Sequence, residues 1–412
     1  MHFFHLPGWD KVHQNCIDFL TEDKCHTVPS LKRKNSVAEE LKSFSDEVVN
    51  FLKNYREELP TAVFDYLSHF ATPKWSSHQW YSRLNAPLFS GLKQHLAELQ
   101  KAKQFDIVMT SYLFTSSVLD SFDRSVLKVI DAHDDLIDRE VHLLRHGIES
   151  DWGSLSEVQA RMAMEKCDLL LGISERETSR HEQIVSGKSF CLGHVNTDDY
   201  QEKPFQVETP EILFVASDNP INQQSWSWFI KQVYPLLEVK IDFKINVLGS
   251  ICLFKEQFKQ RKKIKYIGPV ENLKAHYRRS SMVINPCLGG TGVKIKSLEA
   301  LAHGLPLVTT QYGASGLENL AQKCLLTASS AQEFAESTNS LLLNPALRSE
   351  LGIRGRSFFS RYNQIQKSRL KDLLFLEKSS ETFSEKVGCL IGKNYWSEPI
   401  VCAPENSASN SV

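Results

Sequence analysis

The 412-residue sequence lacks paired cysteines, an excess of charge and any long apolar run. Its nine cysteines are scattered from Cys16 to Cys402 without a CxxC pair, which indicates reduced thiols and argues against a disulfide framework or a zinc knuckle. Lys and Arg (48) nearly balance Asp and Glu (49), so no overall field favours nucleic acid. The opening MHFFHLPGWD is no signal peptide, and no window is apolar for long enough to span a bilayer. We expect a soluble, cytoplasmic protein without a nucleic-acid partner, and peripheral membrane contact stays open.

Short apolar runs that alternate with helical stretches are present instead, and they predict an α/β protein. In the first half, Phe105–Thr110 and Val126–Ile130 are predicted strands, and Ala163–Ile173 runs from a helix end into another strand. Strands at this spacing indicate parallel βαβ units. The polar stretch His194–Thr209 interrupts the pattern, which favours a linker between two domains.

The second half repeats this alternation. A helix is expected from about Asn222 to Leu237, because its apolar residues form one stripe at helical spacing. Another is expected from Pro345 to Arg361. Predicted strands lie at Ile212–Val215, Ile245–Leu248, Lys265–Ile267, Met282–Asn285 and Leu307–Thr310.

These patterns predict two doubly wound, Rossmann-like domains that face each other across a cleft, with ligands beyond the carboxyl ends of the strands. The expected ranges are 1–195 for the first domain, 196–210 for the linker, 211–362 for the second domain, 363–380 for a closing helix and 381–412 for a disordered tail.

A glycine-rich loop follows the predicted strand Met282–Asn285. Gly289, Gly290 and Gly292 allow a tight turn that brings backbone amides close to a ligand. A helix is expected to start near Thr291–Val293, so that its free N–H groups and its dipole point at the same place. An anion such as a diphosphate is the natural guest of this loop.

Charged side chains at the start of that helix sharpen the prediction. Lys294 and Lys296 lie in the first turn, where a cation opposes the dipole unless a bound anion compensates. Glu299 lies one turn after Lys296 on the same face, where it can accept hydrogen bonds from vicinal hydroxyls such as those of a ribose. An ordinary βαβ turn with surface lysines is the alternative. A second glycine loop, Gln311–Glu318, favours the ligand site.

Acidic residues and a histidine follow the predicted strand Val126–Ile130, in the run DAHDD at 131–135. Such a cluster raises a metal hypothesis, to which His142 and His146 could add ligands from one helix face. The aspartates equally suit a solvated helix start, which is the interpretation we favour. No metal site is therefore predicted.

The segment Asn285–Glu318 resembles the donor-site signature of the retaining glycosyltransferase family 4, which has the GT-B fold. The subgroup it resembles reads roughly Pro, glycine turn, Gly-x-Lys-x-Lys-x-x-Glu-Ala-x-Ala-x-Gly-x-Pro-x-Val. The segment Phe214–Leu237 is also similar to that subgroup, with Asn222 and Trp228-Phe229 at matching positions. The likeness extends over about residues 105–362 and is strongest in the first of these segments.

Carried over by position, the resemblance implies a site for a nucleotide-sugar co-substrate, a UDP- or GDP-sugar, and no cofactor. Glu299 would hold the ribose. Thr291 stands where many family members have a Glu that touches the donor sugar, so the motif does not identify the sugar. The residues implied at the diphosphate are Gly290, Thr291, Gly292, Lys294 and Lys296, and those lining the sugar side of the cleft are Ser217, Gly313 and Gly316.

In the first domain, the block that begins at Asp131 resembles the Asp-x-His-Asp segment of the family. On that likeness, His133 would be the catalytic residue and would hydrogen-bond the transferring hexose. Asp134 or Arg139 would shape the acceptor side. A capping or core role for His133 is the alternative.

The resemblance as a whole implies a metal-independent hexosyltransferase of polysaccharide or glycoconjugate biosynthesis. Its donor would be a nucleotide-diphosphate sugar, and its acceptor a glycan, a lipid or another hydroxyl compound. MHFFHLPGWD has no glycine-rich turn where the family usually has a strand followed by one, so the first βα unit is in question. A catalytically inactive GT-B remnant that acts as a nucleotide-binding or scaffold protein is therefore the alternative. An epimerase or a phosphorylase is a third reading.

Overall fold

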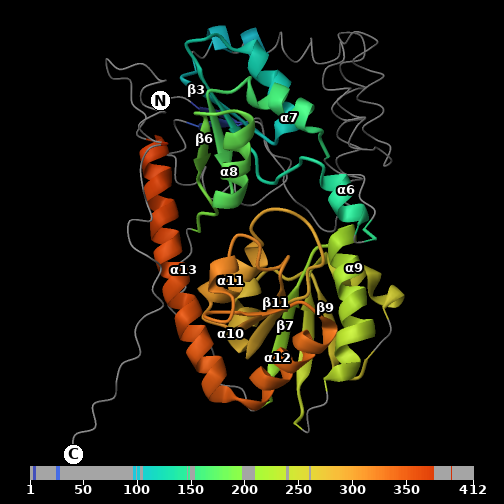
Figure 1. Cartoon of the computed structure of the whole chain (residues 1–412). Helices are drawn as coiled ribbons and strands as arrows, with labels where there is room; N and C mark the ends of the chain where they lie inside the picture. The colour runs from blue at the N-terminus through green and yellow to red at the C-terminus, as the bar shows by residue number, and fades with distance from the viewer. Residues whose placement is uncertain are drawn as a thin grey trace, which may run out of the picture. The chain divides into compact units, whose positions relative to one another are not determined.

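The computed structural model describes residues 3–5, 25–27, 96–98, 100–102, 105–145, 147–148, 154–196, 209–237, 241–258, 261–374 and 391. The chain divides into two units, each built on its own parallel sheet (Figure 1). Unit 1 comprises residues 1–195 and 370–393, and unit 2 comprises residues 196–369 and 394–412. Most of the predicted linker, and the predicted tail apart from residue 391, lie outside the described residues.

The sheet of unit 1 has six strands in the order β2-β1-β3-β4-β5-β6, and every neighbouring pair is parallel. Strand β1 pairs with β2 on one side and with β3 on the other. A central strand thus forms in the N-terminal segment whose βα unit the sequence left in question. The strands are β1 (Phe3–His5), β2 (Cys25–Thr27), β3 (Ile107–Ser111), β4 (Leu127–Asp131), β5 (Leu169–Gly172) and β6 (Ser189–Cys191).

Side-chain caps set the starts of two helices in unit 1. Ser156 and Gln159 form a reciprocal capping box at the start of α7, and the Ser174 hydroxyl accepts a hydrogen bond from the Glu177 N–H at the start of α8. Apolar residues of these helices pack with those of the strands in one buried core. The helical segments are η2 (Leu113–Ser121, 3₁₀), α6 (Arg139–Leu144), α7 (Glu157–Met164) and α8 (Glu175–Ile184).

The sheet of unit 2 also has six parallel strands, in the order β12-β11-β10-β7-β8-β9. The chain runs outward from β7 through β8 to β9 and then returns to the other side of β7 as β10. The sheet therefore has a topological switch point between the carboxyl ends of β7 and β10, which is where such sheets bind ligands. The strands are β7 (Glu211–Val215), β8 (Lys244–Leu248), β9 (Ile264–Gly268), β10 (Met282–Asn285), β11 (Leu307–Thr310) and β12 (Leu326–Ala328).

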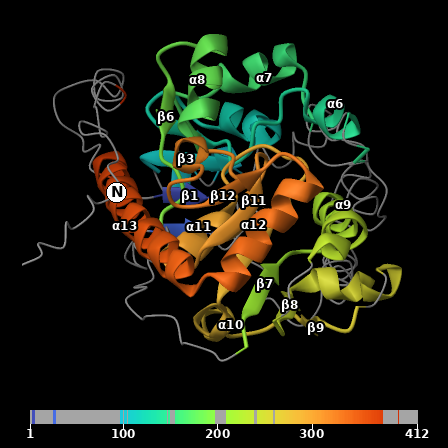
Figure 2. The same cartoon turned by 60° about the horizontal axis from the view of Figure 1, so that its bottom comes forward.

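Helices cover both faces of this second sheet. On one face, Trp228 and Phe229 pack edge-on against Phe334 of α12, which lies along β11 and β12 (Figure 2). Successive side chains of a strand point to opposite faces, so Ile284 joins this cluster while Asn285 faces α11. The helices are α9 (Pro220–Trp228), α10 (Leu273–Arg279), α11 (Ile295–Ala302) and α12 (Ala331–Leu343).

The helix predicted from about Asn222 to Leu237 is three consecutive segments. Helix α9 begins earlier, because the Asn219 side chain caps it and Pro220 occupies its first position. It passes into a π-helix, η3 (Phe229–Val233), and then into a 3₁₀ turn, η4 (Tyr234–Leu236), which contains Pro235. Proline has no N–H to continue the α-helical ladder, which explains the change of geometry.

One long helix, α13 (Pro345–Leu374), replaces the predicted helix ending at Arg361 and the separate closing helix. Its last residues, from Leu370, group with unit 1. A Cβ on Gly352 would lie 2.2 Å from the carbonyl oxygen of Gly304, so these two backbones approach too closely for any side chain. No helix within the described ranges combines the length and the apolar character that crossing a bilayer requires.

Candidate functional site

The loop after β10 has the backbone geometry that its glycines predict. Gly290 and Gly292 have φ values of 91° and 79°, in the left-handed region that glycine adopts without strain. Helix α11 begins at Ile295, so the predicted start near Thr291–Val293 is wrong. The left-handed Gly292 and the extended backbone of Lys294 (φ −84°, ψ 102°) are incompatible with a helix and delay its start.

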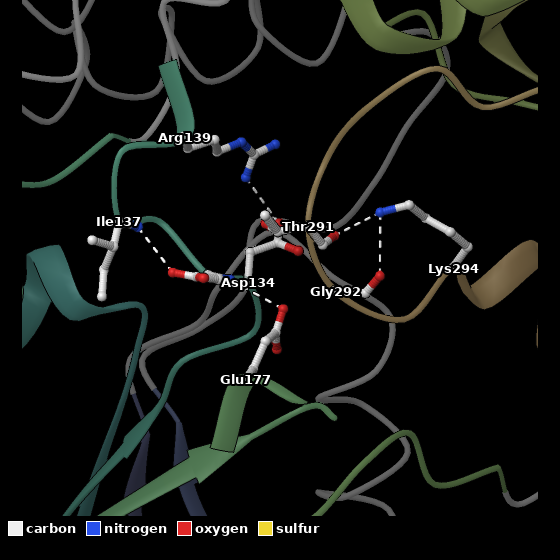
Figure 3. A network of polar contacts seen from close by, with 8 residues as sticks. Asp134, Ile137, Arg139, Glu177, Thr291, Gly292 and Lys294 are labelled. Carbon is white, nitrogen blue, oxygen red and sulfur yellow. Dashed lines mark hydrogen bonds and ion pairs between the residues drawn. The ribbon is translucent and has the colours of Figure 1, made fainter. Parts of the chain in front are cut away.

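Lys294 closes this loop on itself. Its ammonium nitrogen donates to the carbonyl oxygens of Thr291, at 2.6 Å, and Gly292, at 3.2 Å (Figure 3). The same ammonium would lie 3.4 Å from a Cβ placed on Gly290. Four of the five predicted diphosphate-binding residues, Gly290, Thr291, Gly292 and Lys294, therefore form one folded turn ahead of α11.

Lys296 connects helix α11 to helix α9 and to the loop that follows β7, on the other side of the switch point. Its Nζ donates to Oδ1 of Asn222 at 2.8 Å, and Nδ2 of Asn222 donates to the carbonyl oxygen and the hydroxyl of Ser217, at 3.0 and 3.1 Å. The Lys296 Nζ also lies 5.6 Å from the centre of the Phe214 ring. Burial lowers the pKa of Lys296 to about 8. Ser217, which follows β7, is thereby linked to the helix that follows β10.

Glu299 and Gly313 have structural partners that the sequence did not reveal. The Tyr277 hydroxyl of α10 donates to Glu299 Oε2 at 2.9 Å, and the Tyr277 ring stacks on His303. A Cβ on Gly313 would lie 1.9 Å from Oγ1 of Thr309, so packing alone requires glycine there. Gly316 has a φ of 79°, so this second loop is also left-handed at one position.

The second glycine loop is fixed to the first by buried hydroxyls. Ser297 Oγ accepts from Asn285 Nδ2 at 2.9 Å and donates to the carbonyl oxygen of Gly313 at 2.8 Å. Thr310 Oγ1 bonds the carbonyl oxygen of Cys287 and accepts from the Gly313 N–H at 3.1 Å. The first turn of α11 and both loops thus form one connected framework.

In unit 1, strained backbone marks the carboxyl ends of two neighbouring strands. Tyr112 follows β3 with a φ of 64°, and His133 follows β4 with a φ of 58°. Positive φ is uncommon outside glycine, and such strain gathers at functional sites. The centres of the Tyr112 and His133 rings lie 4.8 Å apart, and the Tyr112 N–H donates to the carbonyl oxygen of Asp131 at 2.7 Å. His133 is buried, with Nε2 3.6 Å from Oδ2 of Asp131.

The acidic residues after His133 bind arginines and backbone rather than converging on one point. Asp134 pairs with Arg139 at 3.0 Å (Figure 3). Asp135 accepts from the Ile137 N–H and pairs with Arg180 of α8. Across the residues that the structure describes, no three His, Cys, Asp or Glu side chains are grouped as a metal site would need; His146 is not among those residues.

Helix α8 contacts the loop that follows β4 and contains His133. Glu177 accepts a hydrogen bond from the Asp135 N–H at 3.2 Å, so α8 contacts both the backbone and the carboxylate of Asp135. These contacts fix the residue two positions after His133. They offset part of the energetic cost of the left-handed backbone at His133.

His181 of α8 is fully buried, and neither ring nitrogen has a hydrogen-bond partner within the described part of the chain. Burial lowers the pKa of His181 to about 4. The unfolded state, with a pKa near 6.5, therefore binds the proton first, and stability present above pH 6.5 is lost as the pH falls toward 4.

We expect His181→Leu to remove about 2 kcal/mol of the fall in unfolding free energy between pH 7 and pH 5, measured by urea denaturation. An unchanged pH dependence, matching that of exposed His142→Leu, would contradict this.

Three contributors to these frameworks were absent from the predicted site. Asn222 had been noted only as a match, while Tyr112 and Tyr277 carried no local signal. Each acts on a residue far away in sequence, so spacing along the chain does not reveal it. Positive φ at Tyr112 is equally invisible before folding.

Residues 209–344 match the family model described as Glycosyl transferases group 1. Unit 2 carries a glycosyl transferases group 1 domain. The glycine loops, Lys296 and Glu299 all belong to this glycosyltransferase domain. A protein described as an uncharacterized 44.6 kDa protein in the cps region of Klebsiella pneumoniae is 23% identical to this chain over 353 residues, which are 77% of this chain and 88% of that relative.

Solved structures show the fold. Sucrose-phosphate synthase from Thermosynechococcus elongatus has a TM-score of 0.61 and 13% identity, over 91% of this chain and 99% of its own. Anabaena HepE, solved in complex with UDP, has a TM-score of 0.60 and 12% identity, again over 91% and 99%. The fold is GT-B, as the sequence predicts. The family match supports glycosyl transfer as the activity.

Proposed function

We propose that this chain is a retaining glycosyltransferase that moves a hexose from a nucleotide-diphosphate sugar to a hydroxyl of a glycan or lipid-linked acceptor. The observation that carries the proposal is the arrangement at the switch point of unit 2. There, a left-handed glycine loop precedes the N-terminus of α11, and the Lys296 ammonium is tied to the loop after β7. Free helix N–H groups and a half-buried cation suit a diphosphate.

The chemistry asks for charge stabilisation more than for covalent participation. As the bond to the diphosphate breaks, negative charge grows on the leaving group, and the N–H groups of α11 with Lys296 would stabilise it without a metal or a resident cofactor. Glu299 would accept hydrogen bonds from the ribose. In unit 1, His133 would hydrogen-bond the hexose, and Asp134 with Arg139 would shape the acceptor side.

The proposed donor is a UDP-sugar, chosen over a GDP-sugar because HepE has been solved with UDP and with UDP-glucose. The cps-region relative favours a growing polysaccharide as the acceptor. The reaction would take place in the cytoplasm, with peripheral contact to the membrane wherever the acceptor is lipid-linked.

The wild-type protein is expected to bind UDP at least tenfold more tightly than UMP, because the β-phosphate meets the helix amides and Lys296. Calorimetric titration with UDP, UMP and GDP measures this. With UDP-glucose, UDP-galactose and GDP-mannose supplied separately, with and without EDTA, we expect chelator-resistant release or transfer of one sugar, with NMR reporting retained anomeric configuration.

Two results separate the alternatives. No measurable binding of any nucleotide would defeat the proposal. UDP binding without sugar release or transfer from any donor would instead identify an inactive nucleotide-binding remnant.

A further inference from the structure

We infer that Asn222 is a positioning residue for the donor site: it tethers the Lys296 ammonium over the switch point without neutralising its charge. This inference rests on the proposed diphosphate site. Asn222 is buried in the first turn of α9, and its amide makes three hydrogen bonds, one to Lys296 and two to Ser217.

The partners of Asn222 fix which way its amide points. The carbonyl oxygen of Ser217 can only accept, so the nitrogen Nδ2 must face it at 3.0 Å. The oxygen Oδ1 then faces the ammonium of Lys296, which can only donate. The reversed amide would place NH₂ against NH₃⁺, so the network specifies one orientation.

The backbone of Asn222 is held as firmly as its side chain. The Asn219 side chain accepts from the Asn222 N–H at 2.8 Å as the cap of α9. Asn222 therefore cannot follow Lys296 if that side chain moves, and Lys296 is held to the loop that follows β7. Lysine has a long, flexible side chain, so this tether reduces the rotamer freedom that anion binding would otherwise remove.

A neutral tether leaves the ammonium available to a ligand. The charged or titratable groups that act on Lys296 are Lys294, Glu299 and the Cys287 thiol. An aspartate at position 222 would add a carboxylate 2.8 Å from the ammonium and repel an arriving diphosphate. Asparagine supplies the same hydrogen bond without that charge, which is why we assign it a role in binding and not only in packing.

The test compares Asn222→Asp, Asn222→Leu and the matched control Gln224→Leu, an exposed amide on the same helix. Asn222→Asp is nearly isosteric, and an acidic residue in the first turn of a helix is favourable, but its carboxylate cannot donate to the Ser217 carbonyl as Nδ2 does. Circular dichroism and thermal unfolding of each variant therefore accompany the titrations, and affinities are compared between folded proteins. We expect UDP affinity to fall roughly tenfold or more in Asn222→Asp and severalfold in Asn222→Leu, with no change in Gln224→Leu. Calorimetry between pH 6.5 and 9.5 provides a second readout. Asn222→Asp should shift the alkaline loss of affinity to higher pH, which a purely structural role would not do.

The outcomes distinguish this inference from the function on which it rests. Wild-type affinity and pH profile in Asn222→Asp, with UDP binding intact in the parent protein, would overturn the tether and leave the donor site standing. Equal losses in Asn222→Leu and Gln224→Leu would also overturn it. Absence of nucleotide binding in the parent would defeat the proposed function and the tether together.

Discussion

Replacing His133 is expected to lower turnover by about 100- to 1,000-fold while UDP affinity stays within a few fold. His133 belongs to unit 1, whereas the groups proposed to hold the diphosphate belong to unit 2. If its imidazole hydrogen-bonds the hexose during transfer, its loss removes stabilisation from the transition state and little from nucleotide binding.

The choice of variant follows from the backbone at this position. With a φ of 58°, alanine at 133 adds strain to the loss of the ring, whereas asparagine tolerates left-handed backbone more readily. His133→Asn is therefore measured beside His133→Ala, and His142→Ala, an exposed histidine of α6, is the matched control. Steady-state transfer gives kcat and KM, and calorimetry gives the UDP affinity.

Parallel losses of turnover and UDP affinity in both His133 variants would contradict the catalytic assignment. Full activity in His133→Asn would leave His133 a core histidine packed against Tyr112, the alternative that its burial and ring contact also permit.

The strands of unit 2 could be predicted because their signal is local. Met282–Asn285 and Leu307–Thr310 are fully buried runs that begin with apolar residues and are preceded or followed by a proline, and β10 and β11 have those same bounds. Strand β12 was missed because Leu326–Ala328 is short and only partly buried, so its sequence differs little from that of a loop.

The details of the site depended on information that no short window contains. The start of α11 was placed too early because glycine permits both helical and left-handed backbone, and only the folded loop selects between them at Gly292. The contact between Lys296 and Asn222 joins residues 74 positions apart. Sequence reasoning therefore selected the residue types of the donor loop and could not supply the partners that orient them.

Lys296→Met is expected to weaken UDP binding by roughly 10- to 100-fold, the range for losing a hydrogen bond to a charged group. Methionine keeps the unbranched shape and can pack against the ring of Phe214, so the fold is retained while the charge is lost. In the protein without ligand the pKa of Lys296 is lowered to about 8, and a bound diphosphate is expected to raise it. The UDP affinity of the wild-type protein should therefore be constant below pH 8 and fall by about tenfold per pH unit above it.

In Lys296→Met that alkaline fall should be absent, and in Lys323→Met, an exposed lysine of the same unit, it should remain. Calorimetry over the same pH range for all three proteins decides the matter. The decisive comparison is between the pH profiles, because a general loss of affinity could follow from any disturbance of the loop. Loss of one ionisation with its pKa near 8 identifies the ammonium itself.

Unchanged affinity in Lys296→Met would place the diphosphate elsewhere. A persisting fall above pH 8 would assign the titration to a group other than Lys296.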